Sequence, residues 1–182
     1  MPHTPSRRAQ AISLASAKGK RFVLIAAMFN RTITRALVQG ATRTLRRHGA
    51  SAADIRVLWV PGAFELPVVA ARVAAAKTHP DAVIALGVLI RGETPQYDVI
   101  ARAVAQGLER VAVTASIPVT FGVVVAKTLA QAKTRASLPA PSYAVFRQAK
   151  PRQRTGRMGH NRGTEAALAA IAVLRIFDRL KV

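Results

Sequence analysis

The chain contains no cysteine among its 182 residues. This absence excludes a disulfide scaffold, a thiol nucleophile and any metal site built on thiolates, and it suits a cytoplasmic protein. No apolar run approaches the roughly 18 consecutive residues that a membrane-spanning helix needs, so we expect no membrane partner. The histidines (His3, His48, His79 and His160) lack metal-ligand spacing, and we expect neither a metal nor another cofactor.

Acidic residues are also scarce. The chain has 28 Lys and Arg against 8 Asp and Glu, a formal net charge of +20. Residues 1–53 and residues 110–164 each contain ten basic residues and no acid. Such an excess favours a polyanionic partner such as nucleic acid, although solvated arginines in an arginine-rich composition give the same count. Nucleic-acid binding is therefore an open alternative.

Short apolar runs alternate with longer amphipathic segments along most of the chain. The runs predict buried parallel strands at Phe22–Ala27, Ile55–Val60, Ala82–Leu89 and Ile117–Val125. The segments between and after them predict helices at about 30–48, 64–77, 96–110, 127–136 and 164–180. The alternation predicts an α/β fold, in which an open parallel sheet carries helices on both faces as a flavodoxin-like three-layer sandwich.

Two segments fall outside this alternation. Residues 1–20 are basic and lack periodicity, which predicts a flexible N-terminal arm. Residues 137–160 are rich in turn-forming and basic residues, which predicts a basic loop inserted into the domain formed by residues 21–182. We expect a single domain because the chain is too short for two comfortable ones.

In an open parallel sheet, ligands bind outside the carboxyl ends of the strands. We therefore expect the functional residues at the predicted strand ends, around residues 28–30, 61–65, 87–96 and 120–122. Asn30 and Thr32 offer oxygens that would cap the first helix. Phe29 and Phe121, both placed at strand ends, offer ring faces to a planar heterocycle, with core packing as the common alternative.

Charged and polar residues at helix ends have two interpretations. The turn before the helix at 96–110 contains Glu93 and Thr94, and its free N–H groups would attract an anion or simply form an ordinary cap. Glu65 at a helix start either benefits from the helix dipole or accepts from ligand hydroxyls. Arg135, taken alone, is typical of a solvated surface arginine.

Five segments, taken in order, resemble the lumazine synthase family. They are FN at 29–30, VPGAFE at 60–65, GVLIRGET at 87–94, IPVTFGV at 117–123 and QA with RA between 131 and 136. The resemblance covers about residues 21–136 and resumes at NRG, residues 161–163. Each segment alone is weak evidence, whereas five in order at the family's spacings are specific.

The resemblance implies an enzyme of riboflavin biosynthesis. The family condenses 5-amino-6-(D-ribitylamino)uracil with 3,4-dihydroxy-2-butanone 4-phosphate, giving 6,7-dimethyl-8-ribityllumazine and phosphate. By position, the residues that would contact the pyrimidine are Phe29, by stacking, and Val88, Leu89 and Ile90, through backbone groups. Those that would hold the ribityl chain are Ala63, Phe64 and Glu65. Those that would bind the phosphate are Glu93, Thr94 and Arg135, and Phe121 would close the pocket from a neighbouring subunit.

The sequence departs from the family's pattern at Gln96. The family has a histidine there, its proposed proton carrier, and an amide cannot carry a proton near neutral pH. We therefore expect weakened turnover. The alternative is a catalytically impaired homologue that binds a flavin-like ligand or serves as a structural oligomer.

A second departure is the length of the predicted loop at 137–160, which exceeds the family's usual link. Family members assemble as pentamers, decamers or sixty-subunit shells, and a longer link is associated with failure to close the shell. The resemblance therefore implies a homo-oligomer, with a pentamer or decamer favoured. The basic residues Arg147, Lys150, Arg152, Arg154 and Arg157 would alternatively line a shell and bind nucleic acid.

Overall fold

The computed structural model describes residues 16–137 and 161–180 of the chain. Four strands form one parallel sheet in the order β2-β1-β3-β4. They are β1 (Phe22–Ala27), β2 (Ile55–Val60), β3 (Ala82–Ile90) and β4 (Val119–Ala126). All of β1 and nearly all of β3 are buried, because helices cover both faces of the sheet, and this explains their unbroken apolar runs.

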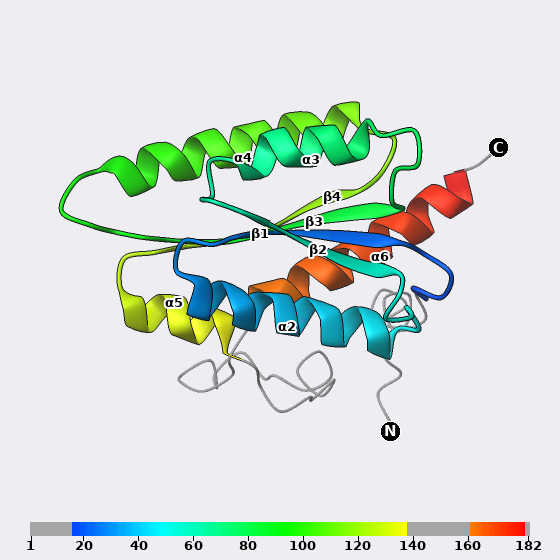
Figure 1. The fold of residues 1–182 in the computed structure, drawn as a ribbon, viewed down its shortest axis with the longest axis horizontal. Helices are drawn as coiled ribbons and strands as arrows, with labels where there is room; N and C mark the ends of the chain where they lie inside the picture. Colours follow the sequence, from blue (N-terminus) through cyan, green and yellow to red (C-terminus); the bar gives the residue numbers. More distant parts are fainter. Residues whose placement is uncertain (1–15, 138–160, 181–182) are drawn as a thin grey trace, which may run out of the picture.

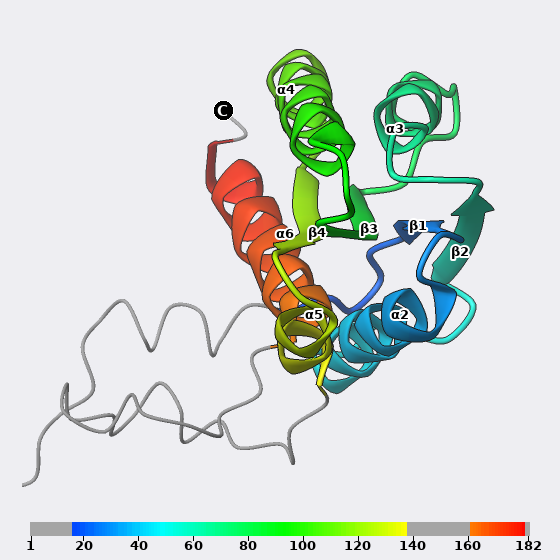
Figure 2. The same ribbon diagram turned by 90° about the vertical axis from the view of Figure 1, so that its left-hand side faces the viewer.

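Within the described residues, five helices form the outer two layers (Figures 1 and 2). The helices α2 (Arg31–Arg47), α5 (Leu129–Ala136) and α6 (Arg162–Leu180) cover one face, and α3 (Leu66–Ala74) and α4 (Gln96–Thr114) cover the other. Each face has its own core of buried apolar side chains. The predicted α/β sandwich is confirmed.

Prolines account for two differences between the predicted and observed bounds. Helix α3 begins at Leu66 rather than Phe64, which places Pro67 in the first turn, where its missing N–H breaks no helical bond. Strand β4 begins at Val119 rather than Ile117, just after Pro118. The carbonyl of Pro118 still accepts from the Val83 N–H at 2.9 Å, an ordinary hydrogen-bond distance.

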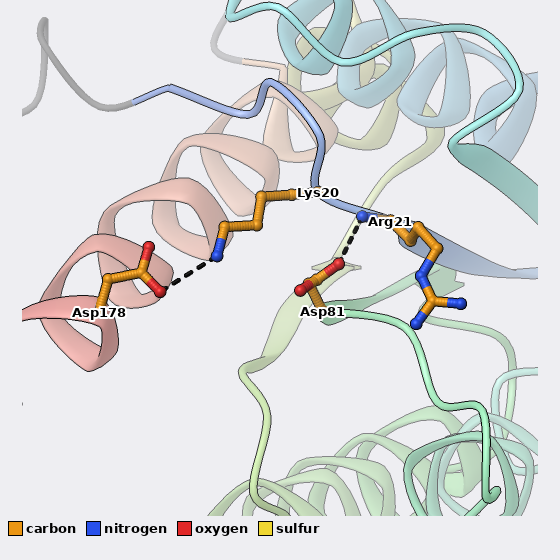
Figure 3. A network of polar contacts seen from close by, with 4 residues as sticks. All are labelled: Lys20, Arg21, Asp81 and Asp178. Carbon is orange, nitrogen blue, oxygen red and sulfur yellow. Dashed lines mark hydrogen bonds and ion pairs between the residues drawn. The ribbon is translucent and has the colours of Figure 1, made fainter. Parts of the chain in front are cut away.

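Polar contacts fix the chain at the amino end of the sheet (Figure 3). The Lys20 Nζ lies 3.0 Å from Asp178 Oδ1 of α6, and the Arg21 N–H donates to Asp81 Oδ2 at 2.7 Å. Residues 16–20, which the sequence assigned to the arm, therefore belong to the domain, and Ala17 is fully buried. The rest of the predicted arm and the predicted loop at 138–160 lie outside the described residues.

In the part of the chain that the structure describes, no helix is both long enough and apolar enough to cross a membrane.

Candidate active site

The connections after β1 and β3 diverge at the carboxyl edge of the sheet, and we call the position between them the crevice. The two strands are neighbours, but the chain leaves β1 for α2 on one face and leaves β3 for α4 on the other (Figure 1). Pairing of the two strands ends at Ala26 and Leu86, while β3 continues to Ile90. The end of β3 therefore extends past β1 and presents backbone groups at the position where open α/β sheets bind ligands.

Backbone hydrogen bonds hold the loops around this crevice. The N–H of Met28 donates to the Val60 carbonyl at 2.8 Å, and that of Phe29 donates to the Pro61 carbonyl at 3.2 Å. On the other side, the Arg91 N–H donates to the Ala126 carbonyl at 3.0 Å. The chain after β1 is thus tied to the end of β2 and its loop, and the chain after β3 is tied to the end of β4.

Asn30 joins the two sides of the crevice. Its side chain makes no capping bond to α2, contrary to the sequence prediction, and its Nδ2 instead donates to the Val88 carbonyl at 3.1 Å. Its backbone is left-handed, with φ 58° and ψ 37°, a conformation that asparagine tolerates better than most residues. Sequence reasoning missed this role, although an asparagine directly between a strand and a helix was the available signal.

Two aromatic rings project from the loops beside the crevice. The side chains of Phe29 and Phe64 are 71% and 63% exposed, so neither packs in the core. Between them in the chain, Ala63 is buried. Glu65 is half-buried, and its Oε2 accepts from the Gly62 N–H at 2.8 Å rather than from an N–H of α3. The second carboxylate oxygen therefore remains available to a hydroxyl donor.

The backbone of β3 supplies the floor of the crevice. Val88 and Leu89 are buried and Ile90 is half-buried. Their side chains therefore pack against the core, and the backbone groups of Val88 and Ile90, which alternate with those of Leu89, face away from β4. One of these, the Val88 carbonyl, is already occupied by Asn30.

The N-terminus of α4 is open to solvent. Glu93, Thr94 and Gln96 are all exposed, and the N-cap residue Pro95 makes no side-chain capping bond. Asp98 and Val99 are the first residues of this helix whose backbone N–H groups have a partner. Both donate to the Pro95 carbonyl. Free N–H groups at a helix start attract anions, as the sequence predicted for this turn.

The structure places Phe121 and Arg135 away from these groups. Phe121 is the third residue of β4 and pairs with Ala85 in the middle of β3, so the prediction that it ends a strand is wrong. Its ring is nevertheless 45% exposed. Arg135 lies exposed in the last turn of α5, on the opposite face of the sheet from α4, and has no hydrogen bond or ion pair with another described residue.

Among the described residues, no three His, Asp or Glu side chains lie close enough together to hold a metal ion.

Comparison with known proteins identifies the family of the chain. Residues 19–178 match the model of the 6,7-dimethyl-8-ribityllumazine synthase family. The chain belongs to this family. A lumazine synthase of Chlorobium phaeobacteroides is 43% identical over 89% of this chain and 92% of its own length. That of Aquifex aeolicus is 40% identical over 91% of this chain and 95% of its own length. The implied activity, the condensation step of riboflavin biosynthesis, is supported by this membership.

Replacing Asn30 tests the link across the crevice. Asn30→Gly keeps the left-handed backbone without strain but loses the bond to Val88, which costs about 1 kcal/mol. Asn30→Ala loses the same bond and adds a strain of about 1–2 kcal/mol. We therefore expect the melting temperature to fall in the order wild type, Asn30→Gly, Asn30→Ala. Equal melting temperatures for Asn30→Ala and wild type would contradict the assignment.

Proposed function

We propose that this lumazine synthase family member carries out its condensation in the crevice between β1 and β3. The observation that supports the proposal is the extension of β3 past β1 at the divergence of their connections, flanked by an exposed aromatic ring and an uncapped helix start. One end of the crevice suits a planar heterocycle, and the other suits a phosphate. The two substrates of the condensation carry these groups: one contains a pyrimidine ring, and the other contains a phosphate.

The pyrimidine stacks on Phe29 in this proposal. Backbone groups of Ile90 read the edge of the ring, because they face away from β4 and lie beyond the pairing of β3 with β1, whereas those of Leu89 face β4. The ribityl chain follows the loop Ala63–Phe64–Glu65. There the unoccupied oxygen of the Glu65 carboxylate accepts from a sugar hydroxyl.

The phosphorylated ketone binds with its phosphate at the start of α4. The free N–H groups and the Thr94 hydroxyl donate to phosphate oxygens, and Arg135 of the assembled protein neutralises the charge. Glu93, at the same turn, binds through its backbone rather than its carboxylate, because two anions repel. Holding both substrates in this way favours attack of the amine on the carbonyl and later loss of phosphate.

Gln96 is the first residue of α4 and lies exposed beside the proposed phosphate site. Its amide holds a substrate oxygen or a water by hydrogen bonding, but it takes up no proton. The proton transfers of the condensation then pass to water or to substrate groups. We propose a working enzyme with reduced turnover on this ground.

The variant Gln96→His tests the role of this position. We expect kcat to rise by about 10²-fold, since a positioned general acid or base contributes about 10²–10⁴-fold. The rate of the variant should also change between about pH 5 and 8, where imidazole titrates. Gln96→Asn, which keeps an amide, should show neither effect.

Equal kcat values for the parent and Gln96→His would show that position 96 carries no proton. A parent that binds the pyrimidine but gives no product, beside an active Gln96→His, would instead identify a catalytically impaired homologue.

The proposed site requires a second subunit. Within one chain, Phe121 lies on β4 far from the carboxyl edge, so it reaches a crevice only in a neighbouring copy. The α3–α4 face suits such a neighbour, because it exposes the apolar side chains Phe64, Val68 and Val99. Phe64 and Val68 also line an apolar hollow of about 470 Å³ between these helices. We propose a pentamer or a pair of pentamers.

Mixing two variants tests the shared site. In an assembly made only of the Phe29→Ala variant or only of the Phe121→Ala variant, every site lacks one of the two aromatic rings. In a ring assembled from equal amounts of both, about one site in four combines an intact Phe29 with an intact Phe121. We expect co-expression to restore about that fraction of wild-type activity.

A mixture no more active than the average of the two variants would place both rings in one subunit. The native mass from light scattering should correspond to five or ten chains, and hollow particles in electron micrographs would refute the proposed oligomer.

A second candidate function is polyanion binding by the outer face of α2. Arg35, Arg43, Arg46 and Arg47 are exposed there, and none has an ion-pair partner among the described residues. The helix contains no acidic residue. A row of unpaired guanidinium groups is suited to the phosphates of nucleic acid, which we propose as its partner beside the catalytic role.

The cytoplasmic location stays a prediction.

Removal of three arginines tests this surface with a single-stranded RNA oligonucleotide. The triple variant Arg35→Gln, Arg43→Gln and Arg47→Gln should bind more weakly and reduce the slope of log affinity against log salt by about 2. A matched triple variant on the other face, with Gln at Arg72, Arg102 and Arg110, changes the net charge equally. Equal losses in both variants would show that only the total charge matters.

A further inference from the structure

Asn161 is a buried polar residue that the proposed chemistry does not use. Its side chain is 2% exposed and lies at the start of α6. The Nδ2 donates to the Ala36 carbonyl of α2 at 3.0 Å and to the Ala136 carbonyl of α5 at 2.8 Å. The Oδ1 accepts from the Thr164 N–H of α6 at 3.0 Å. One amide group therefore joins three helices.

The surrounding backbone is shaped to admit this side chain. A Cβ at Gly40 of α2 would overlap the Asn161 amide, and a Cβ at Gly163 would overlap the Leu37 carbonyl. The two glycines let α2 and α6 approach closely enough for the amide to reach both helices. The position of Asn161 is therefore fixed on all sides.

Helix α5 buries few apolar groups of its own. It spans only eight residues, and its buried side chains are two alanines, Ala132 and Ala136. A helix this short is not stable alone, and two methyl groups bury little apolar surface. Its N-terminus is fixed by Thr128, whose hydroxyl accepts from the Gln131 N–H at 3.2 Å. Its C-terminus is fixed by Asn161 through the Ala136 carbonyl.

Arg135 is the residue directly before Ala136, and its guanidinium has no partner among the described residues. Its placement therefore follows the placement of the last turn of α5. We propose that Asn161 is a positioning residue for Arg135, and through it for the phosphate of the four-carbon substrate. This inference rests on the proposed function, in which Arg135 neutralises that phosphate.

The test compares Asn161→Ser and Asn161→Asp with wild type in the full chain. Both keep an oxygen that accepts from Thr164 and remove the two amide donors. We expect the KM for the ketone phosphate, and the inhibition constant of inorganic phosphate, to rise by about tenfold as a charge-assisted contact weakens. The KM for the pyrimidine should stay within about twofold, because that ring binds elsewhere. If one variant fails to fold, the other carries the test.

Two controls separate positioning from general loss of stability. Leu174→Ala removes a buried side chain of α6 and should lower the melting temperature without raising the inhibition constant of phosphate. In the double variant Asn161→Ser with Arg135→Gln, phosphate should inhibit as in Arg135→Gln alone, because the two residues act through one group.

The outcomes distinguish this inference from the proposed function. An inhibition constant that rises in Arg135→Gln but not in the Asn161 variants would overturn the positioning role alone. An unchanged constant in Arg135→Gln would overturn the proposed phosphate site itself. Equal increases of both KM values in the Asn161 variants would show a merely structural role.

Discussion

The candidate site depends on one constraint, the divergence of the chain after two neighbouring parallel strands. Because α2 and α4 lie on opposite faces, the chain leaves the two strands in opposite directions, and β3 continues beyond the last residue that pairs with β1. The backbone of β3 beyond Leu86 is thus not paired with β1, while hydrogen bonds between the loops join the ends of the strands. The aromatic and polar side chains of the site are additions to this arrangement of the main chain.

Much of the fold follows from local pattern. A strand buried on both faces needs an unbroken apolar run, so the strands at 22–27 and 82–89 could be predicted from the sequence alone. The unpaired N–H groups at the N-terminus of α4 could be predicted as well, because the first N–H groups of any helix lack a partner within the helix. Boundaries were less accurate where Pro67 and Pro118 changed the local hydrogen bonding.

The features that the sequence did not reveal are contacts between distant residues. Asn30 bonds to a carbonyl 58 positions away, and Asn161 bonds to one 125 positions away. A backbone carbonyl carries no residue-specific signal, so composition and periodicity cannot identify the partner. Phe121 was misplaced for a different reason: the predicted strand Ile117–Val125 already extended four residues beyond it, and β4 indeed ends at Ala126.

The bond between the Asn161 amide and the Ala136 carbonyl also has a consequence for evolution. It brings together two points of the chain that are 25 residues apart and holds them inside the domain core. The closure entropy of a connection grows only slowly with its length, by about 0.6 kcal/mol for each doubling. Residues can therefore be gained or lost between these two points at little thermodynamic cost, which makes this junction a natural place for lineages of the family to diverge.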